Sequence, residues 1–156
     1  MIFAETPIPD LLIISPEVHY DSRGYFSETY NFNNFFGSGL NIDFIQDNES
    51  KSSFGVLRGL HFQKPPHEQT KLVRVIEGKI LDVAVDLRKK SKTFGRHFSI
   101  ELSSENKKQL LIPKGFAHGF IVLSESATIS YKVDDYYHPQ HDSCLLYTSD
   151  AADDRV

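Results

Sequence analysis

Short apolar segments that alternate with polar residues recur along most of this chain, with turn residues between them. In Lys71–Ile76, for example, Lys71, Val73 and Val75 occupy alternate positions and share one face of an extended chain. This period of two is typical of half-buried strands, whereas helical signal is scarce. The pattern therefore predicts an all-β fold of the sandwich or barrel type.

Further strands are expected wherever the alternation continues between turns. They are Gly24–Tyr30, Ile80–Leu87, Ser99–Leu102, Gln109–Ile112, Gly119–Leu123 and Thr128–Val133. Glu77–Gly78 fits a hairpin turn between two of these segments. One short helix is expected at Asn31–Phe36, with Asn31 or Asn33 near its start because asparagine caps helix N-termini.

The composition limits the classes of function. A chain of 156 residues with 40% hydrophobic and 24% charged residues predicts one globular domain with one core. A net charge of −4 excludes general nucleic-acid binding, which needs a basic face. The single Cys144 excludes an intramolecular disulfide and suits a reducing compartment. With no apolar run long enough for a membrane span and no signal peptide, we expect a soluble cytoplasmic protein.

The first segment that could carry chemistry runs from Arg58 to Gln63 and contains His61. Strict strand alternation would place Arg58 and His61 on opposite faces. Both can serve one cavity only if the strand is interrupted, and Gly59 is where a bulge costs least. The alternative is an edge strand with a solvated arginine and a surface histidine.

Two more segments carry residues of the right chemical type. In Ile112–Phe120, a proline and a glycine bracket a turn before His118, which could equally be a turn histidine bonded to the backbone. In Ala127–Val133, Tyr131 shares a face with apolar residues and could equally be a core tyrosine. Neither segment decides a function alone.

Taken together, these residues suggest one type of reaction. A histidine base (His61), a lysine cation (Lys71) and a tyrosine acid (Tyr131) that converge in a barrel suit proton abstraction next to a carbonyl. The base removes a carbon-bound proton, the cation stabilises the enolate oxygen, and the phenol returns a proton to the other face.

A metal-dependent cupin such as an oxygenase is the competing interpretation. His61 and His118 could supply two imidazoles to a metal. However, the residue two positions after His61 is Gln63, and glutamine is a poor transition-metal ligand. His67 follows Pro65–Pro66 on an expected loop. We therefore predict no metal.

The same segments are similar to those of a known family, in order over residues 1 to 142. The most specific are Arg58–Gln63 and Pro113–Phe120. The others are Asp21–Glu28, Gln46–Asn48 with Ser50, Gly55–Leu57, Gln69–Arg74, Gly78–Val83, Val85–Arg88 with Ser91, Tyr131–Lys132 and Tyr137–Pro139. On these residues the chain resembles the dTDP-4-dehydrorhamnose 3,5-epimerases, dTDP-sugar epimerases of the cupin superfamily.

The resemblance implies a cupin-type jelly roll with one or two short helices. It also implies an isomerase that inverts C3 and C5 of dTDP-4-keto-6-deoxyglucose through an enolate, giving dTDP-4-dehydro-L-rhamnose for dTDP-rhamnose biosynthesis. The family needs no cofactor, and part of its site is completed across a homodimer. An epimerase acting only at C3 or only at C5 is an alternative, because such enzymes share the base and the acid.

The resemblance also assigns roles to individual residues. It implies that His61 is the base, Tyr131 the acid and Lys71 the group facing the keto oxygen. The implied substrate contacts are Arg58 and His118 near the base, Arg23 and Glu28 at the nucleotide, Gln46, Asp47 and Asn48 in the same site, and Asp142 as a minor candidate.

The resemblance ends near Ser143. In the family a Trp-Asn-Asp stretch follows, and the carboxylate that orients the histidine base lies beyond this point, whereas this chain contains no tryptophan. We therefore expect an epimerase domain at residues 1–142 and a truncated or chimeric tail at 143–156. Because an unoriented imidazole is a poor base, an impaired nucleotide-sugar binder is a further alternative.

Overall fold

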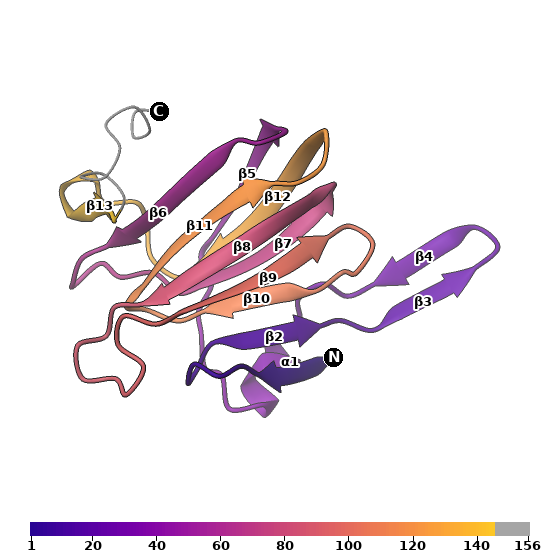
Figure 1. The fold of residues 1–156 in the computed structure, drawn as a ribbon. Helices are drawn as coiled ribbons and strands as arrows, with labels where there is room; N and C mark the ends of the chain where they lie inside the picture. Colours follow the sequence, from indigo (N-terminus) through magenta and orange to yellow (C-terminus); the bar gives the residue numbers. More distant parts are fainter. Residues whose placement is uncertain (146–156) are drawn as a thin grey trace.

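Two antiparallel β-sheets, packed face to face, form the body of the protein (Figure 1). The structure, a computed structural model, describes residues 1–145. The strands of the larger sheet, in order across it, are β1 (Ile2–Glu5), β2 (Leu12–Ser15), β10 (Gln109–Ile112), β7 (Lys71–Glu77), β12 (Ser126–Val133) and β5 (Gln46–Ser53). Those of the smaller sheet are β13 (Asp142–Cys144), β6 (Leu57–Gln63), β11 (Phe116–Val122), β8 (Lys79–Asp86) and β9 (His97–Ser103).

The core lies between the two sheets, as the alternation in the sequence predicted. On β7, Val73 and Val75 point inward, and Ile129 of the neighbouring strand β12 joins them. Ile80 and Phe120 meet them from the smaller sheet. Burial of these apolar side chains is the main source of stability in such a fold. The all-β prediction is confirmed.

A single short α-helix covers the outer face of the larger sheet within the described residues. This helix, α1 (Phe32–Gly37), has Asn31 as its N-cap, whose side chain accepts a hydrogen bond from the Asn34 N–H at 3.1 Å. Phe35 is buried in a second apolar cluster with Leu72 and Leu111. The predicted helix and its cap are therefore confirmed. A 3₁₀ turn, η1 (Pro139–His141), precedes β13.

The predicted hairpin at Glu77–Gly78 is wrong. β7 and β8 lie in different sheets, so this turn is a corner at which the chain crosses from one sheet to the other. Gly78 has a φ of +89°, and a Cβ atom there would overlap the carbonyl oxygen of Ser126. Lys79 N–H donates to Ser124 Oγ at 2.9 Å. A glycine turn signal alone cannot distinguish a hairpin from such a corner.

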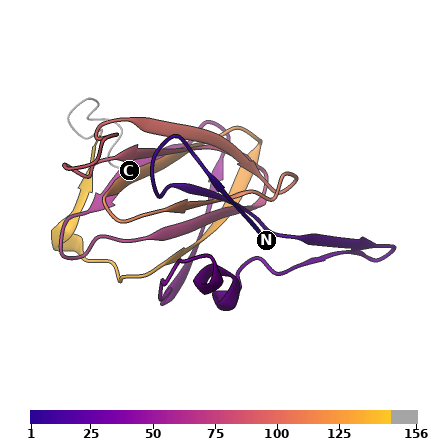
Figure 2. The same ribbon diagram turned by 90° about the horizontal axis from the view of Figure 1, so that it is seen from below.

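A separate hairpin projects from the body, formed by β3 (Val18–Asp21) and β4 (Gly24–Ser27) (Figure 2). The predicted strand Gly24–Tyr30 is therefore too long at its end. After Ser27 the chain returns to the body, where Tyr30 packs against Phe44 with ring centroids 5.5 Å apart. Packing of this aromatic residue overrides the local alternation.

The predicted domain boundary at residue 142 stays a prediction. Ser143 and Cys144 pair with β6 in strand β13, and residues 146–156 lie outside the described residues. In the part of the chain that the structure describes, no helix is both long and apolar enough to cross a membrane.

Candidate active site

A cavity of about 210 Å³ opens between the two sheets. His61 lines it from β6, whereas Lys71 and Tyr131 line it from β7 and β12. The three residues predicted to be catalytic are thus brought into one cavity. The other residues that line it are Ser50, Arg58, His118, Gly119, Phe120 and Ile129.

An interruption in β6 lets Arg58 and His61 serve the same cavity. His118 of β11 pairs with His61, and beyond this pair the register between β6 and β11 shifts. Gly59 adopts a φ of +128°, and a Cβ atom there would lie 2.5 Å from the Cα atom of Gly119. The predicted bulge at Gly59 is confirmed, because only glycine permits this close approach of the two strands.

Lys71 and Tyr131 are diagonal neighbours on the inner face of the larger sheet. Tyr131 pairs with Val73 and Val133 pairs with Lys71, so the two functional residues lie two positions apart across the strands. The Lys71 Nζ atom lies 5.9 Å from the centroid of the Tyr131 ring. Cross-strand neighbours at this spacing keep an ammonium and a phenol beside each other in the cavity.

The environment lowers the pKa of both basic groups. Burial lowers the pKa of Lys71 to about 8, although the charges of Asp82 and Asp142 act in the opposite direction. Burial and the charge of Lys71 also lower the pKa of His61, and Asp142 partly offsets them. The lowered pKa of His61 favours the neutral imidazole, which can accept a proton, and a pKa of about 8 keeps Lys71 mostly charged at pH 7.

Asp82 is a site residue that sequence analysis did not assign. Its Oδ1 atom lies 2.6 Å from His118 Nε2, and its side chain is fully buried. Its other oxygen, Oδ2, has no hydrogen-bond partner among residues 1–145. The available signal in the sequence was an acidic residue in the middle of the apolar strand β8. A charged side chain is rarely buried unless another group pairs with it. Asp82 fixes the orientation of the His118 ring.

The predicted contacts on β5 are divided between its two faces. Gln46 and Asn48 lie on the same face as Ser50, which lines the cavity, and Gln46 Nε2 donates to Asn48 Oδ1 at 2.8 Å. Asp47 points to the opposite face, where it accepts a hydrogen bond from Lys132 Nζ at 2.9 Å. The structure therefore does not bring Asp47 together with the other two, because successive side chains of a strand alternate.

Arg58 and Asp142 lie at the edge of the predicted catalytic group. Arg58 Nε donates to Ser52 Oγ at 2.8 Å, which holds the guanidinium at the cavity wall. Asp142 pairs with Gln63 at the start of β13, and its Oδ2 atom lies 3.5 Å from the Tyr137 hydroxyl. Its carboxylate acts on the pKa values of the cavity through charge and does not line the cavity itself.

Arg23 and Glu28 are not brought to the cavity of their own chain. Arg23 lies at the tip of the projecting hairpin, where its exposed guanidinium bonds to Asp21 at 2.6 Å. Glu28 follows the hairpin and accepts a hydrogen bond from Asn31 Nδ2 at 3.3 Å. Neither residue lines the cavity that holds His61.

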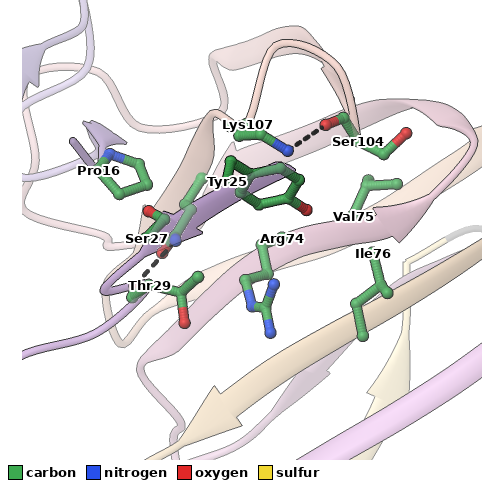
Figure 3. A pocket seen from close by; sticks show the side chains of 10 residues that line it. Pro16, Tyr25, Ser27, Thr29, Arg74, Val75, Ile76, Ser104 and Lys107 are labelled. Atoms are coloured by element: carbon green, nitrogen blue, oxygen red, sulfur yellow. Dashed lines mark hydrogen bonds between the residues drawn. The ribbon is translucent and has the colours of Figure 1, made fainter. Parts of the chain in front are cut away.

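A cation–π contact joins strand β4 of the hairpin to the loop between β9 and β10. Figure 3 shows Tyr25 of β4 beside Lys107, whose Nζ atom lies 3.9 Å from the ring centroid. The same ammonium donates to the carbonyl oxygen of Ser104 at 2.9 Å. Tyr25 and Lys107 line a small cavity of about 80 Å³ with Arg74 of β7. These contacts fix the direction in which the hairpin leaves the body.

Comparison with known proteins agrees with this geometry. Residues 5–153 match the family described as dTDP-4-dehydrorhamnose 3,5-epimerase. The enzyme of that name from Salmonella typhimurium is 51% identical over 152 residues, which cover 97% of this chain and 83% of the relative.

Solved structures of enzymes from this family share the fold. The dTDP-4-dehydrorhamnose 3,5-epimerase of Elizabethkingia anophelis is 53% identical with a TM-score of 0.90, over 95% of this chain and 81% of that chain. The dTDP-6-deoxy-D-glucose-3,5-epimerase of Legionella pneumophila was solved with dTDP-4-keto-L-rhamnose. It is 47% identical with a TM-score of 0.90, over 94% of this chain and 78% of that chain. The fold is therefore the cupin-like β fold of these enzymes, and the chain belongs to the dTDP-4-dehydrorhamnose 3,5-epimerase family.

Proposed function

We propose that this chain inverts C3 and C5 of dTDP-4-keto-6-deoxyglucose, with His61 as base, Tyr131 as acid and Lys71 as the cation facing the keto oxygen. The observation that carries the proposal is the position of His61 and Tyr131 on opposite walls of one cavity, on β6 and β12. A reaction that inverts a carbon needs a proton acceptor on one side and a proton donor on the other.

The 4-keto group of the substrate sets the chemistry. It acidifies the hydrogens on both neighbouring carbons, so one base and one acid can act at C3 and then at C5. His61 takes the proton, and the electrons of the C–H bond form the enolate, whose oxygen carries the negative charge. The Tyr131 hydroxyl then gives a proton to the opposite face of the same carbon, and solvent restores both groups.

Lys71 stabilises the enolate that forms between these two proton transfers. Its ammonium lies on the same sheet face as the phenol, and Lys71 is half-buried in the cavity wall. A buried cation acts more strongly on a developing negative charge than an exposed one. The mechanism uses only side chains of the protein, and no metal or organic cofactor takes part in it.

The nucleotide end of the substrate is held across a dimer in this proposal. Arg23 is exposed at the tip of the hairpin of β3 and β4, which projects from the body (Figure 1), and it does not line the cavity of its own chain. Arg23 and Glu28 of one subunit therefore bind the dTDP group in the cavity of a second copy of the chain. The sugar contacts Arg58 and His118 within one subunit, and Gln46 and Asn48 lie on the strand beside them.

Two further parts of the proposal concern the binding partner and the cellular compartment. The substrate is a dTDP-linked ketosugar, so the protein acts on a small molecule rather than on nucleic acid or a membrane. The lone Cys144 is a free thiol in the structure, which is compatible with the reducing cytoplasm. We place the reaction there, on the route to dTDP-rhamnose.

Hydrogen exchange in deuterated water tests the proposal. The full chain is incubated with dTDP-4-keto-6-deoxyglucose, and deuterium at each sugar carbon is measured by NMR spectroscopy and mass spectrometry. Deuterium at both C3 and C5 is expected, together with inversion at both. His61→Ala should abolish both, whereas His97→Ala, at an exposed histidine on β9, should change neither.

The outcomes separate the alternatives. Deuterium at one carbon only would identify an epimerase specific for C3 or C5. Binding of dTDP without exchange at either carbon would identify a nucleotide-sugar binder. Tight stoichiometric metal that is lost in His61→Ala, together with loss of activity on chelation, would support a metal-dependent cupin and contradict the mechanism.

A further inference from the structure

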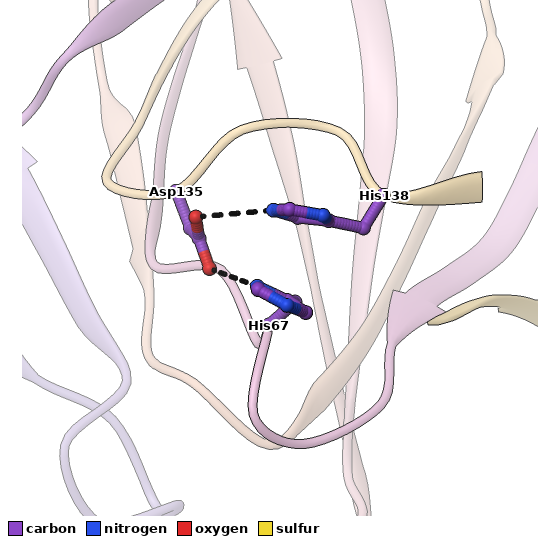
Figure 4. A group of neighbouring side chains, drawn as sticks. All are labelled: His67, Asp135 and His138. Carbon is purple, nitrogen blue, oxygen red and sulfur yellow. Dashed lines mark hydrogen bonds and ion pairs between the residues drawn. The ribbon is translucent and has the colours of Figure 1, made fainter. Parts of the chain in front are cut away.

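Three chelating side chains meet at one end of the sheets, away from the residues that line the catalytic cavity. His67 lies in the loop between β6 and β7, whereas Asp135 and His138 lie in the segment that follows β12. Figure 4 shows both imidazoles directed at the same carboxylate. In residues 1–145 these three form the group of histidine, cysteine and acidic side chains whose spacing suits a metal ion.

The distances between the candidate ligand atoms are close to those of a zinc site. His67 Nδ1 lies 3.2 Å from Asp135 Oδ2, and His138 Nε2 lies 3.6 Å from Asp135 Oδ1. All three ligand atoms lie within 4.8 Å of one another. Zinc bonds of about 2.0–2.1 Å in a tetrahedron place ligand atoms roughly 3.3 Å apart. Binding of an ion would therefore need little change at the two contacts with Asp135, whereas the stacked imidazole rings would have to move apart.

The backbone that carries these side chains is already held in place. The buried Gln63 donates through Nε2 to the carbonyl oxygens of His67 at 2.6 Å and Tyr136 at 3.1 Å. Its Oε1 atom accepts from the His138 N–H at 2.8 Å. One glutamine side chain thus fixes both segments, and such support is typical of sites that hold ligands in a set geometry.

The two imidazoles lie against each other. The rings of His67 and His138 are stacked with centroids 3.4 Å apart. Each ring directs one nitrogen at the Asp135 carboxylate, so the candidate ligand atoms lie on the same side of the group.

A third histidine stands beside them. The centroid of the His141 ring lies 4.8 Å from that of His67, and its Nδ1 atom is buried without a hydrogen-bond partner among residues 1–145. A buried ring nitrogen with no partner is costly, and coordination of an ion would satisfy it.

We propose that His67, Asp135 and His138 bind one Zn²⁺ ion per chain. His141 stands beside this group, and its ring would have to turn to become a fourth ligand. A donor set of two or three imidazoles and one carboxylate binds zinc in preference to magnesium or calcium. The site is structural and joins the loop between β6 and β7 to the segment that leads into β13. It is independent of the proposed epimerase reaction, because none of its residues lines the catalytic cavity.

Zinc titration of the untagged full chain tests the site. The protein is stripped with EDTA, the chelator is removed, and Zn²⁺ is added in competition with a chromogenic chelator. One ion per chain is expected. Binding should weaken at least tenfold in His138→Ala and in Asp135→Asn, and His97→Ala, at an exposed histidine on another strand, should bind as the wild type does.

Thermal denaturation gives a second readout and guards against misfolded variants. Zn²⁺ should raise the Tm of the wild type and of His97→Ala, because a ligand that binds only the folded state stabilises it. Asp135→Asn keeps the side-chain size and the acceptor for the Tyr136 N–H, so it should fold and show a smaller rise. Absence of zinc binding by the wild type, or equal binding by all variants, would overturn the proposal.

Discussion

At the scale of single residues, burial sets the chemistry of the cavity. The pKa of Lys71 falls to about 8 because its ammonium is desolvated, and the pKa of His61 falls for the same reason. Sequence analysis named both residues, because their types suit enolate chemistry and their segments resemble the family. It did not assign Asp82, whose role depends on contact with His118 from another strand. Contacts of this kind are not encoded in local spacing.

The pH dependence of kcat/KM should reflect the ionisation of His61 and of Lys71. His61 must be neutral to accept a proton. Because its pKa is lowered from 6.5, the usual value for histidine, activity should stay high to below pH 6.5. Lys71 must be charged, so activity should fall as the pH rises through about 8. Measurement of kcat/KM from pH 5 to 10 checks both limbs. In Lys71→Gln the alkaline limb should disappear along with most of the activity, and a persistent limb would exclude Lys71 as its source.

Tyr131→Phe separates the acid from the base. Loss of the phenol should slow inversion about 10²–10⁴-fold, the usual contribution of one general acid. Exchange of the abstracted proton with solvent should continue, because His61 remains on its own wall of the cavity. The ratio of exchange to inversion in deuterated water is the measurement. Equal losses of exchange and inversion would show that the tyrosine mainly packs.

At the scale of elements, alternation located β4 and the strands from β7 to β12, and it missed β1, β2, β3, β5 and β13. β7, β8, β10 and β12 were predicted within a few residues, because their inner faces are apolar. β5 was missed because both of its faces are polar. Gln46, Asn48 and Ser50 share one face, and Ser50 lines the cavity.

The β6 interruption should be sensitive to a single methyl group. In Gly59→Ala the new Cβ would overlap the Cα atom of Gly119, in addition to the positive φ. Gly95→Ala is the matched control, since Gly95 has a φ of +82° with nothing within 4 Å of the added atom. Positive φ alone costs about 1–3 kcal/mol.

Urea denaturation measures both changes. Gly95→Ala should lose about that amount from the free energy of unfolding, and Gly59→Ala should lose clearly more, with activity lost as the Arg58 and His61 side chains shift. Similar losses in the two variants would mean that β6 relaxes around the methyl group.

At the scale of the whole molecule, the hairpin of β3 and β4 separates the residues proposed to bind one substrate. The body carries His61 and Tyr131, and the hairpin carries Arg23 outward. The sequence placed these residues in one site through the family resemblance. It could not show that they are apart within one chain, because the direction of a hairpin depends on contacts such as that between Tyr25 and Lys107.

Mixing of two variants tests the shared site. Arg23→Ala should weaken dTDP binding in its own homodimer, and His61→Ala should abolish turnover. In a mixed dimer, one cavity combines an intact His61 with an intact Arg23 from the other subunit. Random exchange of subunits should restore about a quarter of the wild-type sites. Activity of the mixture no greater than the sum of the two separate variants would place Arg23 and His61 in the same chain's site.

In the proposed dimer, the outward hairpin also makes catalysis depend on the concentration of the protein. Tyr20 and Phe26 are about two-thirds or more exposed on it, at 71% and 66%. An isolated subunit would leave these aromatic rings in water and its cavity without a nucleotide clamp. Turnover per chain should therefore decline on dilution below the dissociation constant of the pair, and saturating dTDP-sugar should shift that decline to lower concentrations, because each bound nucleotide links two chains.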